Sequence, residues 1–143
     1  MPKEIDRLFE KEKDLSSHLK DLGVILLDLS DSVKDKLSEK DQNEVKDLLS
    51  TFAMNCDAMR DDITGAEAIL KGIKTKTITM RDSTLNTAEL KQHLSEVKTA
   101  VQKLRNSAGE FLQARDREMV FQEMNKSYSD VLGSLTELMA ESV

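Results

Sequence analysis

A chain of 143 residues has room for one domain of ordinary size, and it carries 34% charged but only 3% aromatic residues. This balance favours long helices and disfavours a compact β-rich domain, which usually holds more aromatic and β-branched residues. The formal net charge is -6, and residues 1–38, 39–80 and 81–143 each hold more acids than bases. The chain therefore lacks the basic patch typical of nucleic-acid-binding proteins, and no nucleic-acid partner is expected.

The first predicted helix covers about residues 3–37. Its apolar residues recur at alternating steps of four and three: Leu15, Leu19, Leu22, Leu26, Leu29 and Val33. The stripe widens where Val24, Ile25 and Leu27 join it. A wider apolar face predicts two neighbouring helices, so we expect this helix to be central in a bundle.

The second predicted helix covers about residues 39–76. It follows a polar segment in which Ser38 and Asp41 resemble a capping box. No glycine or proline forces a turn there, so one continuous helix through this segment stays an alternative. The apolar stripe of the second helix is regular: Phe52, Cys56, Met59, Ile63, Ala66, Leu70 and Ile73. Residues 77–86 are expected to form a loop.

The third predicted helix covers about residues 87–142, and Asn86 with Glu89 forms its capping signal. Its stripe begins with a regular run: Leu90, Leu94, Val97, Val101, Leu104, Ala108 and Phe111. The stripe changes phase across the polar segment 113–118. Because this segment has no glycine or proline, we favour one long helix, and the alternative is a fourth helix that folds back near residues 113–118.

These elements predict an all-α fold in which residues 1–143 form a single domain. We expect an elongated antiparallel bundle of three long helices, or four if the last one folds back. The packing should resemble that of a coiled coil, because the stripes repeat at the spacing by which helices pack lengthwise.

Cys56 is the only cysteine, so the chain cannot form an internal disulfide. The absence of a disulfide framework is typical of proteins in a reducing compartment. The first 14 residues are charged throughout, unlike a secretory signal peptide. The longest apolar stretch, residues 22–29, falls short of the roughly 20 residues of a membrane span. We therefore expect a cytoplasmic protein.

The sequence shows no catalytic, cofactor-binding or metal-binding motif, and no cofactor is expected. His18 and His93 are the only histidines, and Asp14 and Glu89 precede each of them by four residues. This spacing places each pair on one helix face, and we interpret both as solvated surface pairs.

One segment is locally basic, since residues 68–81 contain no acid. We call its four cations the basic tip: Lys71, Lys74, Lys76 and Arg81. They are candidates for contact with an anion or a lipid headgroup. The alternative is that they are simply cations near the C-terminus of a helix, where the negative end of the helix dipole stabilises them.

The C-terminal stretch carries an apolar face: Met119, Phe121, Met124, Tyr128, Val131, Leu135 and Leu138. If the third helix extends beyond the shorter ones, this face has no cover within the chain and becomes a partner interface. The alternative is ordinary bundle core.

The sequence therefore predicts a non-enzymatic helical interaction or scaffolding module that self-associates or assembles with other helical subunits. We expect a homo- or hetero-oligomer. The alternative is a membrane-apposed scaffold that contacts anionic lipid through the basic tip. A carrier of an apolar ligand or an enzyme is the least supported class, because no polar groups converge on a site.

Overall fold

The computed structural model describes the backbone of residues 3–33, 37–80 and 83–141, and the side chains of 4–33, 37–79 and 84–135. The described elements follow in chain order: α1 (Lys3–Leu29), the short 3₁₀ helix η1 (Ser30–Ser32), α2 (Glu39–Gly72), β1 (Thr77–Met80), β2 (Ser83–Asn86), α3 (Thr87–Glu110) and α4 (Arg117–Glu141). The predicted helical bundle is confirmed.

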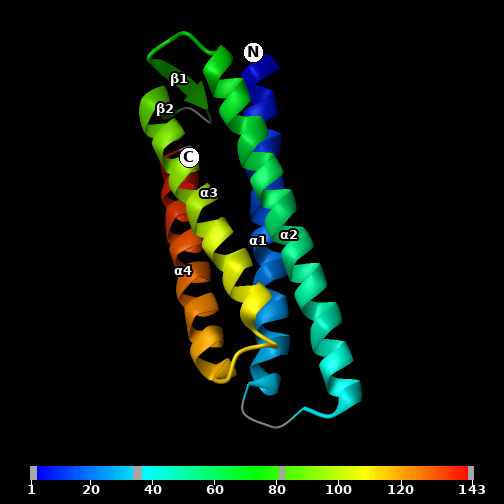
Figure 1. The fold of residues 1–143 in the computed structure, drawn as a ribbon. Helices are drawn as coiled ribbons and strands as arrows, with labels where there is room; N and C mark the ends of the chain where they lie inside the picture. The colour runs from blue at the N-terminus through cyan, green and yellow to red at the C-terminus, as the bar shows by residue number, and fades with distance from the viewer. Residues whose placement is uncertain (1–2, 34–36, 81–82, 142–143) are drawn as a thin grey trace.

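The helices run up and down along one long axis, and the β1–β2 hairpin lies at the end where the chain begins (Figure 1). Each helix packs mainly against the next helix along the chain, and α1 makes a narrower contact with α4. The core runs along the centre of the bundle, where the stripes of the four described helices meet.

Two predicted helix starts are confirmed by their caps. The Ser38 hydroxyl accepts a hydrogen bond from the backbone N–H of Asp41 at 3.2 Å, which begins α2. The Asn86 side chain accepts from the N–H groups of Ala88 at 2.9 Å and Glu89 at 3.1 Å, which begins α3. These side chains satisfy donors that a helix start leaves without a partner. The alternative of one continuous helix through residues 38–44 is wrong.

The first helix is shorter than predicted, because α1 ends at Leu29 instead of near Leu37. The Ser30 hydroxyl donates to the carbonyl oxygen of Leu27 at 2.6 Å, a local bond that competes with helix propagation. Arg117 Nε then donates to the carbonyl oxygen of Ser32 at 3.0 Å. A group from the start of α4 thus holds the chain where it leaves α1.

The prediction of one long third helix is wrong, because the structure has separate helices α3 and α4. The Asp116 carboxylate accepts from the N–H of Met119 at 3.2 Å and caps the start of α4. Phe111, just after α3, is fully buried and holds the turn against the core. The phase shift in the stripe therefore marks a turn that lets α4 pack on α3.

The predicted loop 77–86 is a two-stranded antiparallel hairpin, in which Ile78 pairs with Leu85 and Thr79 with Thr84. Its threonines and isoleucine favour extended backbone, because they are β-branched. The second helix ends at Gly72 instead of near residue 76, for the same reason.

The expected broad face of α1 is also wrong in part. Ile25 and Leu26 are buried, but Val24 is 53% and Leu27 73% exposed. The physical reason is that α1 meets α4 over a narrow area. The two helices approach closely at Gly23, where an added Cβ would lie 2.6 Å from the Tyr128 hydroxyl oxygen.

Candidate functional site

A cleft lies at the hairpin end of the bundle. Its volume is about 540 Å³, and it is lined by Glu4, Ile5, Gly72, Ile73, Thr75, Thr77, Ile78 and Thr79. These residues come from the start of α1, the end of α2, the connection that follows it, and β1. Residues 72–79 are contiguous, and the start of α1 is distant from them in the sequence, so the site forms when α1 packs beside the end of α2.

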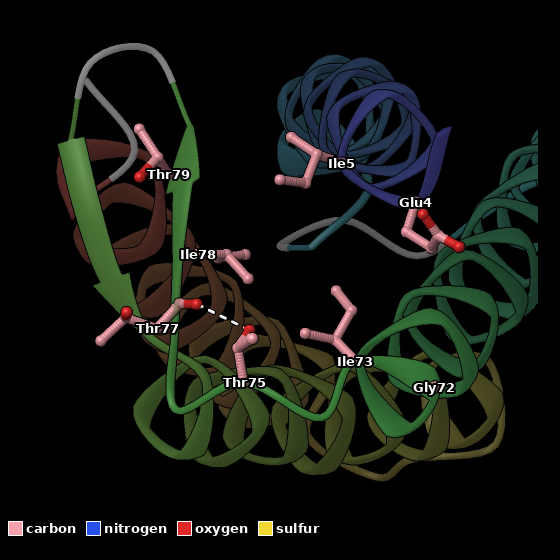
Figure 2. Close-up of a pocket in the computed structure, with 8 residues that line it drawn as sticks. All are labelled: Glu4, Ile5, Gly72, Ile73, Thr75, Thr77, Ile78 and Thr79. Carbon is pink, nitrogen blue, oxygen red and sulfur yellow. Dashed lines mark hydrogen bonds between the residues drawn. The ribbon is translucent and has the colours of Figure 1, made fainter. Parts of the chain in front are cut away.

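Figure 2 shows the isoleucines Ile5, Ile73 and Ile78 directed into the space between α1, the end of α2 and the hairpin. Ile5 and Ile78 are buried, and Ile73 is half-buried. The Thr75 hydroxyl donates to the carbonyl oxygen of Thr77 at 2.8 Å, which ties the connection to β1. The cleft thus has an apolar floor, with Glu4 as its one titratable lining residue. The side chains of Thr77 and Thr79 lie on the other side of β1 (Figure 2).

One edge of β1 faces this cleft. The cleft borders Thr77, Ile78 and Thr79, three consecutive residues. Successive side chains of a strand point to opposite faces, so a cavity over one face would border every second residue. The cleft borders all three, and the Thr77 carbonyl oxygen accepts the hydroxyl of Thr75, another lining residue, so the backbone of β1 also lies along the cleft.

The hydrogen-bond pattern of the hairpin shows which groups point to that edge. The N–H of Thr87 donates to the carbonyl oxygen of Lys76 at 2.9 Å, so these two form a bonded pair. Bonded and non-bonded pairs alternate along an antiparallel ladder. In this register Ile78 bonds to β2, whereas the N–H and C=O of Thr79 point away from it.

The basic tip lies beside the cleft. Lys71, Lys74 and Lys76 are exposed, and Lys71 is in the last turn of α2. Arg81 lies outside the described residues. These cations neighbour the lining residues in the sequence, and none of the three lines the cleft itself. The apolar lining was missed, and the run of β-branched residues at 73–79 is the signal that could have found it.

The predicted partner interface on the C-terminal stretch lies mainly in the core. Met124, Val131 and Leu135 are buried, and Phe121 and Tyr128 are half-buried against the same core. Met119 is 56% exposed. The side chain of Leu138 lies outside the described ones. Because α4 folds back onto α3, the chain itself covers most of this face.

Both histidines contact residues other than the acids four positions earlier. His18 Nδ1 donates to Asn55 Oδ1 at 3.1 Å, and its Nε2 lies 3.6 Å from Asp62 Oδ2, so it links α1 to α2. His93 Nδ1 lies 3.9 Å from Glu96 Oε2. Burial raises the pKa of Asp62 above its ordinary 3.8, and the neighbouring His18 opposes this shift.

Two ion pairs join α2 to α3 along their outer seam. Arg105 contacts Asp57 through both arms of its guanidinium, with Nε 2.7 Å from Oδ1 and Nη2 3.3 Å from Oδ2. Lys98 Nζ lies 3.1 Å from Glu67 Oε1. All four side chains are partly exposed, so these pairs orient the helices and contribute little to stability.

Cys56 is expected to be unreactive in the folded protein. It is fully buried, and burial raises the pKa of its thiol from 9.0 to about 12. Thiol reagents react with the thiolate, whose fraction at pH 8 falls on the order of a hundredfold or more with this shift. We expect Ellman's reagent to label the thiol slowly in buffer and rapidly in urea. Rapid labelling in buffer would show that the side chain is accessible.

Within residues 3–33, 37–80 and 83–141, no group of three or more His, Cys, Asp or Glu residues could hold a metal ion. None of the helices in these ranges combines the length and apolar character needed to cross a bilayer. Comparison of the chain with protein-family models, with curated proteins and with solved structures finds no match.

Proposed function

We propose that this chain is a protein–protein interaction module whose partner binds the cleft at the hairpin end. The single observation that supports this is the apolar floor of Ile5, Ile73 and Ile78, held open at the surface by three separate elements. Apolar clefts rimmed by polar groups are typical binding sites. Glu4 is the one titratable side chain among the lining residues, so the cleft resembles a docking surface more than a catalytic centre.

This proposal moves the predicted partner site from the face of α4 to the hairpin end of the bundle. The burial of Met124, Val131 and Leu135 removes the reason to expect a second subunit on that face. Assembly through the hairpin end remains part of the proposal, because the cleft has no cover in the described part of the chain.

The second candidate is contact with anionic lipid through the basic tip. The exposure of Lys71, Lys74 and Lys76 on one end of the molecule supports it. Each such cation contributes about 1 kcal/mol at a membrane surface, so three give a weak attraction. The net charge of -6 opposes it further. We therefore favour the protein partner.

The experiment is selection of peptide ligands against the full chain from a phage-displayed random library, followed by isoleucine-methyl NMR. Peptides that bind should shift the methyl signals of Ile5, Ile73 and Ile78. The signals of Ile25 and Ile63, buried elsewhere in the bundle, are the internal controls and should stay in place. Ile73→Glu should abolish binding, and Met54→Glu, at a position 71% exposed on α2, should not.

The proposal is wrong if selected peptides shift the control methyls instead, or if Ile73→Glu and Met54→Glu bind them equally well. Binding of the wild-type chain to phosphatidylserine vesicles, lost when Lys74 and Lys76 are changed to Glu, would favour the second candidate.

A further inference from the structure

The cleft offers two kinds of recognition at once, an apolar floor and the edge of β1 that does not pair with β2. The Thr75 hydroxyl already binds the Thr77 carbonyl oxygen on this edge, which leaves the backbone groups of Thr79. The N–H and C=O of Thr79 point away from β2, toward the side that the cleft borders. Unpaired strand edges are templates for another strand, and proteins use them to bind extended peptides by main-chain hydrogen bonds. From these observations, and resting on the proposed function, we infer that the partner is an extended acidic peptide segment that pairs with β1.

The dimensions of the site set the length of the bound segment. β1 has 4 residues, Thr77–Met80, which span about 13 Å at 3.3 Å per residue. The floor of Ile5, Ile73 and Ile78 lies beside one edge of this strand (Figure 2). A bound strand of about four residues would turn every second side chain toward this floor. Those side chains should be aliphatic, and β-branched residues fit an extended backbone best.

Three exposed cations near the cleft favour an acidic partner, and the one acid that lines the cleft, Glu4, opposes this preference. Lys71, Lys74 and Lys76 are exposed at this end, and residues 68–79 contain no acid. Carboxylates that flank the bound strand would meet these cations, which adds to the encounter rate and to the orientation of the peptide. A second copy of the chain is a poorer occupant, because its own hairpin would bring the same lysines against them.

The probe is a nine-residue peptide, acetyl-Asp-Asp-Val-Thr-Ile-Thr-Val-Asp-Asp-amide, labelled for fluorescence anisotropy. We expect the wild-type chain to bind it in a salt-dependent manner. A peptide with lysines in place of its aspartates should bind at least about tenfold more weakly, because its charges oppose the basic tip. Equal binding of the two peptides would overturn the acidic preference.

Two proline variants test pairing at the strand edge. Thr79→Pro removes the N–H that faces the cleft, and it removes no bond between β1 and β2. Thr84→Pro is the matched control, because Thr84 is the partner of Thr79 and its N–H points to the opposite edge of the hairpin. We expect Thr79→Pro to weaken binding about tenfold or more and Thr84→Pro to change it by less than about twofold.

Circular dichroism and thermal unfolding establish that both proline variants fold. If Thr79→Pro does not fold, strand pairing is tested instead with two peptides in which alternate backbone amides are N-methylated, and their binding to the wild-type chain is measured. One of the two N-methyl registers should lose binding, and retention in both would overturn strand pairing.

The outcomes separate this inference from the proposed function. Equal binding by Thr79→Pro and wild type, together with loss in Ile73→Glu, means that the cleft binds partners without strand pairing. Loss in neither variant overturns both. A wild-type dimer in light scattering that Thr79→Pro dissociates would instead identify a second copy as the occupant. Vesicle binding that depends on Lys74 and Lys76 but not on Thr79 would identify anionic lipid.

Discussion

Replacement of Leu22 by Asp is expected to unfold the domain or to lower its free energy of unfolding by about 4 kcal/mol or more. Leu22 is fully buried in the second half of α1. A carboxylate there would replace leucine contacts within the hydrophobic core, and a buried unpaired charge is among the most costly changes in a protein. Total stabilities of domains are about 5–15 kcal/mol, so little of the native state should remain.

Leu27→Asp is the matched control for this prediction. The two leucines lie on the same helix and receive the same substitution, but Leu27 is 73% exposed. Its replacement should change the stability by no more than about 0.5 kcal/mol. Urea unfolding followed by circular dichroism measures both. Equal losses would mean that Leu27 is covered by a partner or by a different packing of α1.

The second large effect is expected for Leu135→Glu on α4. Leu135 is 1% exposed, so the change should lower the free energy of unfolding by about 3–5 kcal/mol. The expectation that this residue contacts a second subunit makes a different prediction, namely that the variant releases a folded monomer. The two interpretations therefore differ in the measured stability of the variant.

Met119→Glu is the control on the same helix, because Met119 is 56% exposed. It should leave the stability almost unchanged. Urea unfolding combined with light scattering gives stability and mass for the same samples. A wild-type oligomer that Leu135→Glu converts to a monomer of undiminished stability would contradict the core position of α4 and restore the partner interface.

The helix stripes and the helix starts could be predicted from the sequence. The second stripe is a clear example, since Phe52, Cys56, Met59 and Ile63 are all fully buried. Local rules suffice for such features, because 3.6 residues per turn place these side chains on one face whatever lies opposite. The caps at Ser38 and Asn86 are equally local, since each bonds to N–H groups within three residues of itself.

The position of α4 could not be predicted in the same way. The phase shift across residues 113–118 was visible, but both a long helix and a turn are compatible with it. The structure resolves this through contacts between distant residues, such as the bond from Arg117 to Ser32 and the approach of Tyr128 to Gly23. Whether an apolar face is core or partner surface depends on such contacts.

By itself, the sequence determined that the chain is helical, where its main stripes lie and where its positive charge gathers, because these are properties of neighbouring residues. Only the tertiary structure decided that Val24 and Leu27 face outward and that Ile5, Ile73 and Ile78 share one cleft. The physical reason is that burial is set by neighbours in space. Ile5 meets Ile73 and Ile78 only when the start of α1 packs beside the end of α2 in the folded bundle.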